Sequence, residues 1–361
     1  MSSIAFYAPM KPPDHPTPSG DRRIARLLQR ALERAGHDVV LASRLRLREG
    51  AGDAAAQTAL AAAAEEEADR LIGALRLQRP ALWFTYHCYY KAPDLIGPRV
   101  AEALGVPYVV AEGTRAAKRL QGPWARFAAA SESALDRAAA IFWFTTRDYP
   151  ALEAARPPAQ RLIHLPPFSA LGEIAAEPVA QDGPIRLVTV AMMRAPDKLS
   201  SYRALAAALA LLDDVDWRLT IGGDGPAEAA VRAAFAPFGE RVIFAGRKDE
   251  RPDVHALYAG ADLLVWPGHN EAFGMVYLEA QAMGRAAVAE NRPGVREVVA
   301  PSGALTAPND PEAFAEAIRR FARDRAALAR AGAAARAHML AHHGIEAAGE
   351  RLRAALAPLL A

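Results

Sequence analysis

The sequence contains a single cysteine, Cys88. An intramolecular disulfide or a zinc site built from cysteines needs more than one, so this chain can form neither. One cysteine in 361 residues fits a protein of a reducing compartment. We expect Cys88 to be a small buried residue, because free cysteine is among the residue types most often buried.

Long apolar runs are also missing. No charge-free apolar stretch approaches the roughly 18 residues that a membrane helix needs. The first residues, Met-Ser-Ser-Ile-Ala-Phe-Tyr, have no basic region before an apolar one, which a signal peptide would show. The sequence therefore predicts a soluble, cytoplasmic protein.

The sequence also has little excess of either sign of charge. The formal net charge is +2, and no dense run of arginine and lysine occurs that would follow a phosphate backbone, so no nucleic-acid partner is expected. No Asp-x-Asp motif stands in a loop that should face a cleft, and Asp213, Asp214 and Asp224 fit turns. We therefore predict no metal and no cofactor.

The length and the 52% of hydrophobic residues fit about two well-packed domains. Short apolar strands alternate with helical segments in both halves, a pattern typical of an α/β fold with mostly parallel sheets. Periodicity stops between Pro166 and Pro184, where prolines and acidic residues accumulate. We predict an N-terminal domain over 1–170 and a C-terminal domain over 184–343. The last helix, about 344–361, should pack back on the first domain.

The most informative stretch runs from Val265 to Glu279. It begins as an apolar strand and ends as a helix that should open near Phe273. The first amides of a helix lack partners and suit a phosphate, and Gly274 would allow a close approach. Glu271 lies before the helix and Glu279 in its second turn, so both carboxylates can accept hydrogen bonds from sugar hydroxyls. The alternative to a binding site is an ordinary helix with two exposed acidic side chains.

This stretch resembles the signature Glu-(Gly/Ala)-Phe-Gly-x-x-x-x-Glu of the retaining GT-B glycosyltransferases of family 4, also called group 1. The resemblance implies the GT-B fold, in which two doubly wound, Rossmann-like domains face a cleft. It also implies that Glu271 contacts the donor sugar and Glu279 the nucleotide ribose. It implies that the amides between them bind the diphosphate. The donor-binding residues expected from this stretch are Glu271, Ala272, Phe273, Gly274, Met275, Val276 and Glu279.

Further donor contacts are expected outside the signature. Arg194 and Lys198 lie on a predicted strand-to-helix loop, before a cap signal at Ser200 and Ser201, where two cations would stabilise a departing diphosphate. The resembling family has an arginine and a lysine in this loop. Four more residues match family positions or stand in suitable loops: Gly20, which follows Ser19 and precedes a predicted N-cap at Asp21, the turn residues Gly223 and Asp224, and Arg247.

The acceptor is expected on the N-terminal domain. Aromatic and polar residues from Tyr86 to Lys91 end a predicted strand, where rings suit a sugar. His87 matches a family histidine, although a buried histidine bonded to backbone is an alternative. Glu112 follows the next strand, where the family often has a histidine. Lys118, with Arg115 and Arg119, suits an anionic acceptor or is simply an exposed basic turn.

We predict a retaining hexosyltransferase that uses a UDP- or GDP-linked sugar and a saccharide, lipid or small-molecule acceptor. The predicted catalytic residues are Glu271, Arg194, Lys198 and His87. The acceptor-side residues are His87, Tyr86, Lys91, Glu112 and Lys118. Alternatives are a sugar-nucleotide epimerase, a phosphorylase, or a non-catalytic homologue that binds the nucleotide sugar. An arginine stripe, Arg22, Arg26, Arg30 and Arg34, is expected to be solvated, with weak peripheral membrane contact as the alternative.

Overall fold

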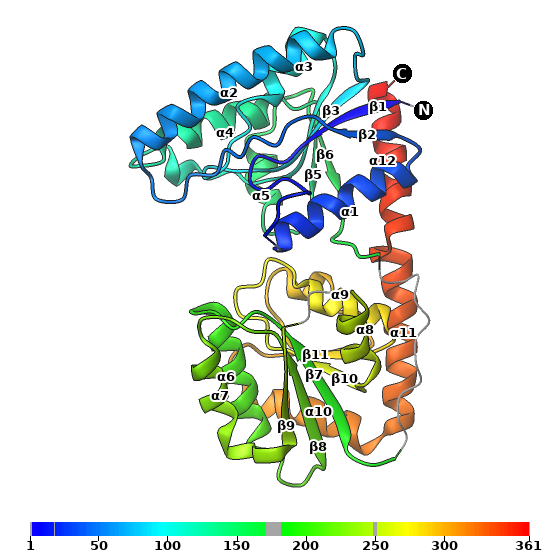
Figure 1. The fold of residues 1–361 in the computed structure, drawn as a ribbon. Helices are drawn as coiled ribbons and strands as arrows, with labels where there is room; N and C mark the ends of the chain where they lie inside the picture. Colours follow the sequence, from blue (N-terminus) through cyan, green and yellow to red (C-terminus); the bar gives the residue numbers. More distant parts are fainter. Residues whose placement is uncertain (1, 18, 171–181, 248–250, 361) are drawn as a thin grey trace. The chain divides into compact units, whose positions relative to one another are not determined.

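The structure is a computed structural model that describes residues 2–17, 19–170, 182–247 and 251–360. The chain divides into two compact units (Figure 1). The N-terminal unit comprises Met1–Pro166 together with Ile345–Ala361, and the C-terminal unit comprises Pro167–Gly344. Residues 171–181, within the predicted boundary, lie outside the described residues.

The N-terminal unit is built on a parallel sheet with the strand order β2-β1-β3-β4-β5-β6 among its described residues. Its strands are β1 (Ser3–Tyr7), β2 (Asp38–Leu41), β3 (Leu82–Cys88), β4 (Tyr108–Gly113), β5 (Ala140–Trp143) and β6 (Arg161–His164). Its helices are α1 (Gly20–Arg34), α2 (Ala54–Leu75), α3 (Gly97–Leu104), η1 (Ala117–Arg119), α4 (Ala125–Arg137), α5 (Tyr149–Ala154) and α12 (Ile345–Leu360). Helices cover both faces of the sheet (Figure 1).

Helix α12 joins this unit from the far end of the chain and packs against α1. Contact is close at Gly349, where an added Cβ would lie 3.0 Å from the Cβ of Arg34 and 3.2 Å from the carbonyl oxygen of Ala31. Arg34 also pairs with Glu346 at 2.8 Å. Leu352 of α12 is fully buried. The last helix is therefore part of the N-terminal core.

The C-terminal unit has a second parallel sheet, with the order β12-β11-β10-β7-β8-β9 in the part of the chain that is described. Its strands are β7 (Ile185–Val190), β8 (Trp217–Gly222), β9 (Val242–Gly246), β10 (Leu263–Val265), β11 (Ala286–Glu290) and β12 (Ala304–Thr306). Its helices are α6 (Asp197–Leu209), α7 (Glu228–Phe235), η3 (Ala236–Arg241), α8 (Arg251–Ala259), α9 (Met275–Ala282), η4 (Val295–Glu297), α10 (Pro311–Arg323) and α11 (Arg325–His343).

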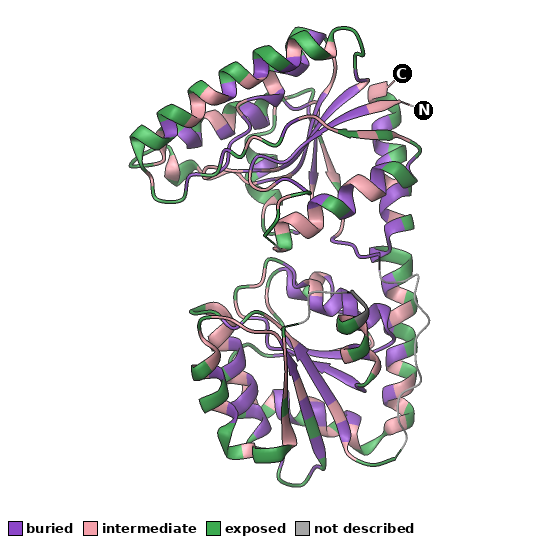
Figure 2. Cartoon of the chain, viewed as in Figure 1, coloured by how far each residue is buried: buried purple, intermediate pink, exposed green. Residues whose placement is uncertain are grey.

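Both sheets lie inside their units. Central strands such as β3, β10 and β11 are buried along nearly their whole length. Helices such as α1, α2 and α10 are buried on one side and exposed on the other, whereas α9 is buried on almost all sides (Figure 2). Parallel strands covered by helices on both faces lose their exposure to water, which explains their continuous apolar runs. The predicted α/β class with two doubly wound, Rossmann-like units is confirmed. No helix of the described ranges is long and apolar enough to span a membrane.

Several element ends differ from the sequence-based prediction. Helix α3 begins at Gly97, after a turn in which the Asp94 carboxylate accepts hydrogen bonds from the amides of Ile96 at 3.0 Å and Gly97 at 2.7 Å. Strands β3 and β4 continue past their predicted ends at Tyr86 and Ala111. His87 and Glu112 are therefore strand residues rather than loop residues.

Candidate donor and acceptor sites

The signature stretch lies at the carboxyl end of β10 and leads into α9. Trp266 is buried and packs edge-on against Tyr202, with ring centroids 4.9 Å apart. The Tyr277 hydroxyl donates to the Trp266 carbonyl at 2.9 Å, so the start of α9 is fixed to the end of the strand. Gly274 precedes the helix with φ of 80°, and an added Cβ would lie 2.6 Å from the Tyr277 ring. The backbone conformation and the packing of Tyr277 thus require glycine here.

Glu271 and Lys198 form an ion pair at the start of this site. The indole Nε1 of Trp266 donates to the same Glu271 oxygen at 3.0 Å. The side chains of Lys198 and Glu271 are only 18% and 12% exposed, so the two charges are held in a restricted geometry. Two residues predicted from separate motifs are therefore brought together by the fold.

The prediction that Lys198 lies in a loop is wrong. Helix α6 begins at Asp197, so Lys198 is in its first turn. Ser200 and Ser201 are inside the helix rather than at its cap. The Ser201 hydroxyl accepts a hydrogen bond from the amide of His269 at 2.9 Å and so connects α6 to the signature loop. Arg194 lies in the loop before α6, exposed, and forms no ion pair within the described ranges.

The glycine-rich turn after β8 packs closely against the neighbouring loop after β7, and the donor contact predicted for Gly223 and Asp224 stays a prediction. An added Cβ would lie 2.0 Å from the Ala191 carbonyl oxygen at Gly223, and 2.4 Å from that of Met193 at Gly225. The amide of Met193 also donates to the Asp224 carbonyl at 2.7 Å. These residues fix the loop that carries Arg194.

Glu279 lies in α9 and is 4% exposed. Its Oε2 accepts a hydrogen bond at 2.9 Å from the hydroxyl of Tyr258 in α8, a partner that the sequence did not indicate. The alternative of two exposed acids is therefore wrong for both glutamates. Ala272 is exposed and its carbonyl is approached closely by Gly294, where an added Cβ would lie 1.9 Å away, while Phe273 and Val276 are buried and Met275 is partly exposed.

Arg247 follows β9 directly and is exposed. Among the predicted donor residues that the structure describes, Lys198 and Glu271 are joined directly through their side chains.

Sequence reasoning missed a charged group beside the signature. Glu290, at the carboxyl end of β11, is 3% exposed and pairs with Arg292, while His269 Nε2 lies 3.5 Å from its Oε1. Arg292 also donates to the Asn309 side chain at 2.8 Å. Burial, followed by the charges of Glu271 and Glu290, raises the pKa of the Tyr277 hydroxyl well above its ordinary value. The signal available in the sequence was the position of Glu290 directly after a short apolar run, since polar residues at the carboxyl ends of parallel strands often belong to binding sites.

In the N-terminal unit, His87 and Glu112 occupy matching positions on neighbouring strands, since Tyr86 pairs with Ala111 and Cys88 with Gly113. Both have positive φ, 63° for His87 and 58° for Glu112. A non-glycine residue in this region is uncommon and costs about 1–3 kcal/mol, and such strain is concentrated at functional sites. Two strained polar residues side by side therefore mark this edge of the sheet.

His87 is bonded to Asp21, whose carboxylate lies 2.9 Å from Nδ1. Burial lowers the pKa of His87, but the nearby Glu112 and Asp21 carboxylates outweigh burial, so the pKa is raised. Burial raises the pKa of Glu112, against the lowering effect of His87. Burial and the Glu112 charge raise the pKa of Tyr86 well above its ordinary value. Predicted acceptor-side residues Tyr86, His87 and Glu112 are therefore one electrostatic group.

Asp21 was predicted as the N-cap of α1, and this is wrong. Ser19 is the cap, since its hydroxyl accepts from the amide of Arg22 at 3.2 Å, and Gly20 is the first helical residue. Asp21 is thereby free to reach His87. The role of Asp21 was missed because His87 lies 66 positions further along the chain.

The other basic residues predicted on the acceptor side have different surroundings. Lys91 lies over the ring of Trp124, 5.0 Å from its centroid, and Arg119 lies 5.2 Å from the same centroid. Lys118 is exposed in η1. Arg115, by contrast, is occupied by Glu132 at 2.6 Å and Asp136 at 2.7 Å, so the idea that it binds an acceptor is wrong.

Cys88 is fully buried, and burial is the main cause that raises its thiol pKa to about 12. Within the described residues, no group of three or more histidine, cysteine, aspartate or glutamate side chains is arranged to hold a metal ion.

The paired Rossmann-like units and the glutamate signature define the GT-B class of glycosyltransferases. Residues 184–324 match the family of group 1 glycosyl transferases. Over 137 residues the chain is 34% identical to a GDP-mannose-dependent α-(1-6)-phosphatidylinositol dimannoside mannosyltransferase of Mycobacterium tuberculosis, covering 38% of this chain and 35% of the relative. It is 33% identical over 156 residues to a D-inositol 3-phosphate glycosyltransferase of Streptomyces avermitilis, covering 40% of this chain and 33% of the relative.

The chain thus spans about a third of the length of the curated relatives it matches. Solved structures match over the whole chain. Sucrose-phosphate synthase from Thermosynechococcus elongatus has a TM-score of 0.72 at 20% identity, covering 99% of both chains. Anabaena HepE in complex with UDP and glucose has a TM-score of 0.70 at 15% identity, covering 99% of this chain and 100% of HepE. The GT-B fold and the predicted resemblance to group 1 glycosyltransferases are confirmed.

Proposed function

We propose that this protein is a retaining hexosyltransferase that takes its sugar from a UDP- or GDP-linked donor. The observation that carries the proposal is the ion pair between Lys198 and Glu271 at the start of two helices, with Glu279 in the second turn of α9. A site for a nucleotide sugar needs carboxylates and cations, because carboxylates accept hydrogen bonds from the hydroxyls, while cations and helix amides bind the diphosphate. The relatives named for GDP-mannose and the neighbour named with UDP support a nucleotide-linked donor.

Each residue has a proposed role. Glu271 accepts hydrogen bonds from the donor sugar, Glu279 binds the ribose, and the first amides of α9 bind the diphosphate. Lys198 stabilises the negative charge that develops on the leaving diphosphate, aided by the exposed Arg194. Such preorganised charges act at the moment when the bond to the sugar breaks.

The acceptor is proposed to bind the N-terminal unit, around His87, Tyr86, Glu112 and Lys91. The strained backbone and the paired charges at the ends of β3 and β4 support this assignment. Because a lone buried cysteine fits a reducing compartment, the proposed setting is the cytoplasm.

The test is incubation of the full chain with UDP-, GDP- and ADP-linked hexoses, with and without candidate acceptors. We expect slow release of free sugar from one donor and faster release with an acceptor. The product's anomeric configuration, followed by NMR, should match that of the donor. An inverted product would refute retention. Formation of an epimer, or binding without any turnover, would favour the epimerase or the non-catalytic homologue instead.

A further inference from the structure

Three loops of the N-terminal unit meet at the carboxyl edge of its sheet. They follow β1, β2 and β3, which are neighbours in the order β2-β1-β3. Backbone hydrogen bonds join them: the amide of Leu47 donates to the Pro9 carbonyl at 2.8 Å, and that of Glu49 donates to the Lys91 carbonyl at 2.9 Å. The loops therefore form one surface, at the edge where open parallel sheets bind their ligands.

Four cations belong to this region: Lys11 after β1, Arg22 near the start of α1, and Arg46 and Arg48 after β2, with Arg46 bonded to the Met10 carbonyl beside Lys11. We call them the basic cluster. Burial is the first cause that lowers the pKa of Lys11, and the charges of Arg46, Arg22 and Arg48 lower it further, against a raising effect of Asp21. Positive charges thus crowd one another here.

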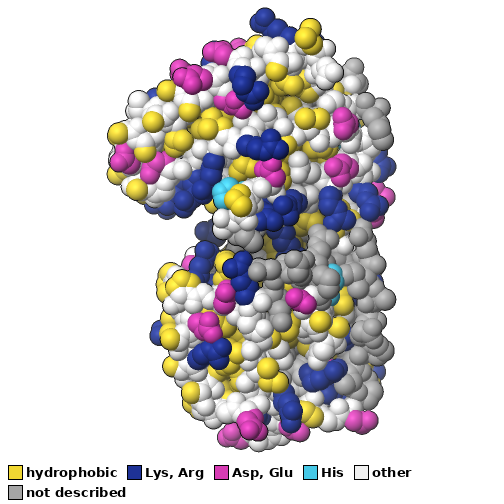
Figure 3. Space-filling model, viewed as in Figure 1, with side chains coloured by type: hydrophobic (Ala, Val, Ile, Leu, Met, Phe, Trp, Pro, Cys, Tyr) yellow, Lys and Arg dark blue, Asp and Glu magenta, His cyan; other side chains and the backbone are white. Residues whose placement is uncertain are grey.

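Backbone carbonyls hold three members of the basic cluster in place. Lys11 Nζ donates to Thr17 at 3.3 Å, Arg22 to Pro16 at 3.0 Å, and Arg46 Nε to Met10 at 2.8 Å. Each of these bonds uses only part of the donor capacity of its group, since a guanidinium has five N–H groups and an ammonium three. Figure 3 shows Lys and Arg side chains, in dark blue, on the face of this unit that is in view.

The acids nearby are already engaged elsewhere. Asp14 pairs with Arg44 at 2.5 Å, and Asp21 with His87 at 2.9 Å. Glu49 accepts hydrogen bonds from the amides of Ala51 and Gly52, both at 2.6 Å. In the part of the chain that is described, no member of the basic cluster forms an ion pair with a carboxylate. The cluster therefore carries positive charge that a ligand can balance.

We propose that the basic cluster binds a phosphate group carried by the acceptor. This inference rests on the proposed function, because it names the chemical class of the acceptor. A phosphate carries up to two negative charges and several acceptor oxygens, so it can bind the forked N–H groups of two or three guanidiniums at once. A carboxylate has one charge and two oxygens and matches this arrangement less well.

The rest of the acceptor has a suitable surface beside the cluster. Tyr90 and Trp124 lie edge to face with centroids 5.7 Å apart, and Lys91 and Arg119 lie over both rings. Aromatic side chains suit a sugar or polyol ring, and the buried Nε1 of Trp124 has no hydrogen-bond partner among the residues that the structure describes. The phosphate belongs either to a soluble sugar or polyol phosphate or to the headgroup of a phosphorylated glycolipid.

Calorimetry on the full chain tests this inference. The probes are inorganic phosphate, glucose 6-phosphate, glucose 1-phosphate and inositol 1-phosphate, compared with glucose, inositol and glucuronate. We expect at least one phosphate ester to bind about tenfold or more tightly than its parent compound and than glucuronate, with affinity falling as salt is added. Absence of binding by every phosphate probe and by the vesicles below, or equal binding of glucuronate, would overturn the proposal.

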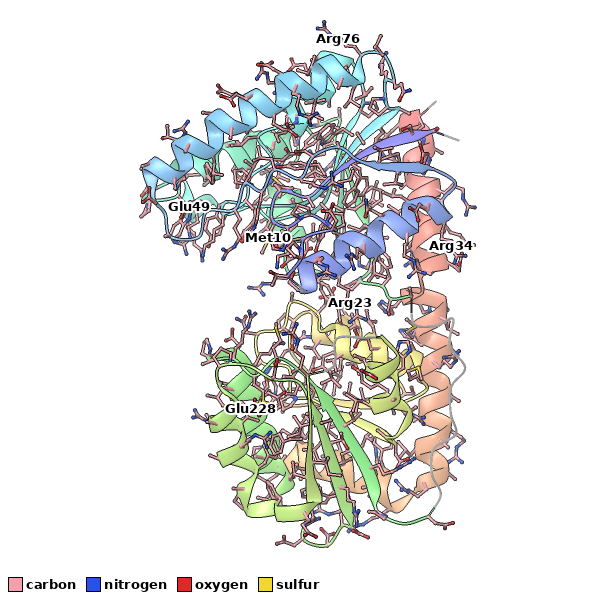
Figure 4. All side chains as sticks on the ribbon, in the orientation of Figure 1. Met10, Arg23, Arg34, Glu49, Arg76 and Glu228 are labelled. Carbon is pink, nitrogen blue, oxygen red and sulfur yellow. The ribbon has the colours of Figure 1, made fainter. Side chains whose placement is uncertain are left out.

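The test variant is Arg46→Gln with Arg48→Gln, and the matched control is Arg76→Gln, an exposed arginine at a different end of the same unit from Met10 (Figure 4). The double variant should lose about tenfold or more in affinity for the phosphate ester, while the control keeps it. Lys11→Gln provides a second, single change with the same expected direction. If the double variant and Lys11→Gln bind the phosphate ester as tightly as the Arg76→Gln control does, the basic cluster is not the phosphate site.

Two further measurements separate the sources and the hypotheses. Sedimentation with phosphatidylcholine vesicles that contain phosphatidylinositol identifies a headgroup phosphate, and binding of the soluble esters identifies a free one; either supports recognition of phosphate. Hydrolysis of the nucleotide sugar is measured on the same variants and should be unchanged. If the parent chain binds a phosphate ester but uses no nucleotide sugar, the proposed function is refuted. If the parent uses the donor but binds no phosphate, or if the cluster variants lose donor use, only this inference is refuted.

Discussion

Lys198 is the residue whose charge the proposed reaction depends on most. Replacing it with alanine removes the cation beside Glu271 and, in the proposed mechanism, the stabilisation of the leaving diphosphate. We expect Lys198→Ala to lower kcat by about 10²- to 10³-fold, the usual effect of losing one preorganised charge donor. Steady-state kinetics and a melting curve on the same preparation measure the two effects.

Arg203→Ala is the control, since Arg203 is exposed on the same helix. It should keep both activity and melting temperature. A folded Lys198→Ala variant with the parent's kcat would remove this lysine from the mechanism.

The two glutamates of the signature should divide the donor between them. Glu279→Gln should weaken free nucleoside diphosphate and intact donor alike, because the ribose is present in both. A hydrogen bond to a charged group contributes about 1.5–3 kcal/mol. Glu271→Gln should weaken only the intact donor, because its partner is the sugar. Titration of both variants with both ligands tests this, and parallel losses would contradict the division.

Tyr258→Phe offers a finer control for Glu279. It removes the hydroxyl that donates to Oε2 and leaves the carboxylate in place. It should reduce nucleotide affinity less than Glu279→Gln does.

The His87–Asp21 pair makes a prediction about pH. The Glu112 and Asp21 carboxylates raise the pKa of His87 although burial lowers it. The pair therefore stabilises the folded state fully below the histidine pKa of the unfolded chain, about 6.5. This stability is lost as the pH rises through the higher pKa that His87 has in the folded state. The pKa of Asp21 is lowered: burial raises it, but His87 lowers it more, so this stability is also lost as pH falls through the folded aspartate value. Asp21→Asn should lower the pKa of His87, measured by NMR titration of the imidazole. An unchanged or higher value would contradict the pairing.

The sequence pointed to these residues but not to their partners in the fold. His87, Glu112, Lys198 and Glu271 were identified from strand ends and from the signature. The Asp21 contact joins positions far apart in the chain, and its own local pattern favoured a helix cap. The positive φ values of His87 and Glu112 were not predicted, because glutamate gives no signal for this conformation and histidine gives a much weaker one than glycine does.

At the scale of elements, the turn before η4 should be the most sensitive glycine position of the donor site. Gly294 has φ of 82°, and an added Cβ would lie 1.9 Å from the carbonyl oxygen of Ala272 in the signature. Gly294→Ala should therefore destabilise the protein by more than the ~1 kcal/mol of the backbone conformation alone, and should weaken nucleotide binding. Chemical denaturation and calorimetry measure the two effects.

Gly239→Ala separates crowding from conformation. Gly239 also has positive φ, 54°, but nothing lies within 4 Å of an added Cβ. It should cost much less than Gly294→Ala. Equal losses would show that the contact with Ala272 has no energetic weight.

The elements themselves were largely predictable, because apolar runs and helical periodicity record which faces are buried. Errors occurred at the ends, where a single side chain decides. Ser19 rather than Asp21 caps α1, and Lys198 is already helical. The packing of the glycine turn after β8 against the loop after β7 was not predicted, because it is a contact between segments that no local pattern contains.

At the scale of the whole molecule, the two units should lose stability separately. Leu352 in α12 is fully buried within the N-terminal unit, and Leu328 in α11 is fully buried within the C-terminal unit. Leu352→Ala should cost about 2–5 kcal/mol and speed hydrogen exchange mainly in β1 to β6, whereas Leu328→Ala should do so in β7 to β12. Exchange followed by mass spectrometry distinguishes them. A uniform rise over both units would show that they unfold as one.

The return of α12 to the first unit also sets an order of events on the ribosome. Domains generally fold as units during synthesis, with the N-terminal one first. Here the C-terminal unit has all its residues once Gly344 has emerged, while the N-terminal unit still lacks Ile345–Ala361. The face of α1 that α12 covers, around Ala31 and Arg34, stays open until then. The nascent chain therefore completes its second unit before its first.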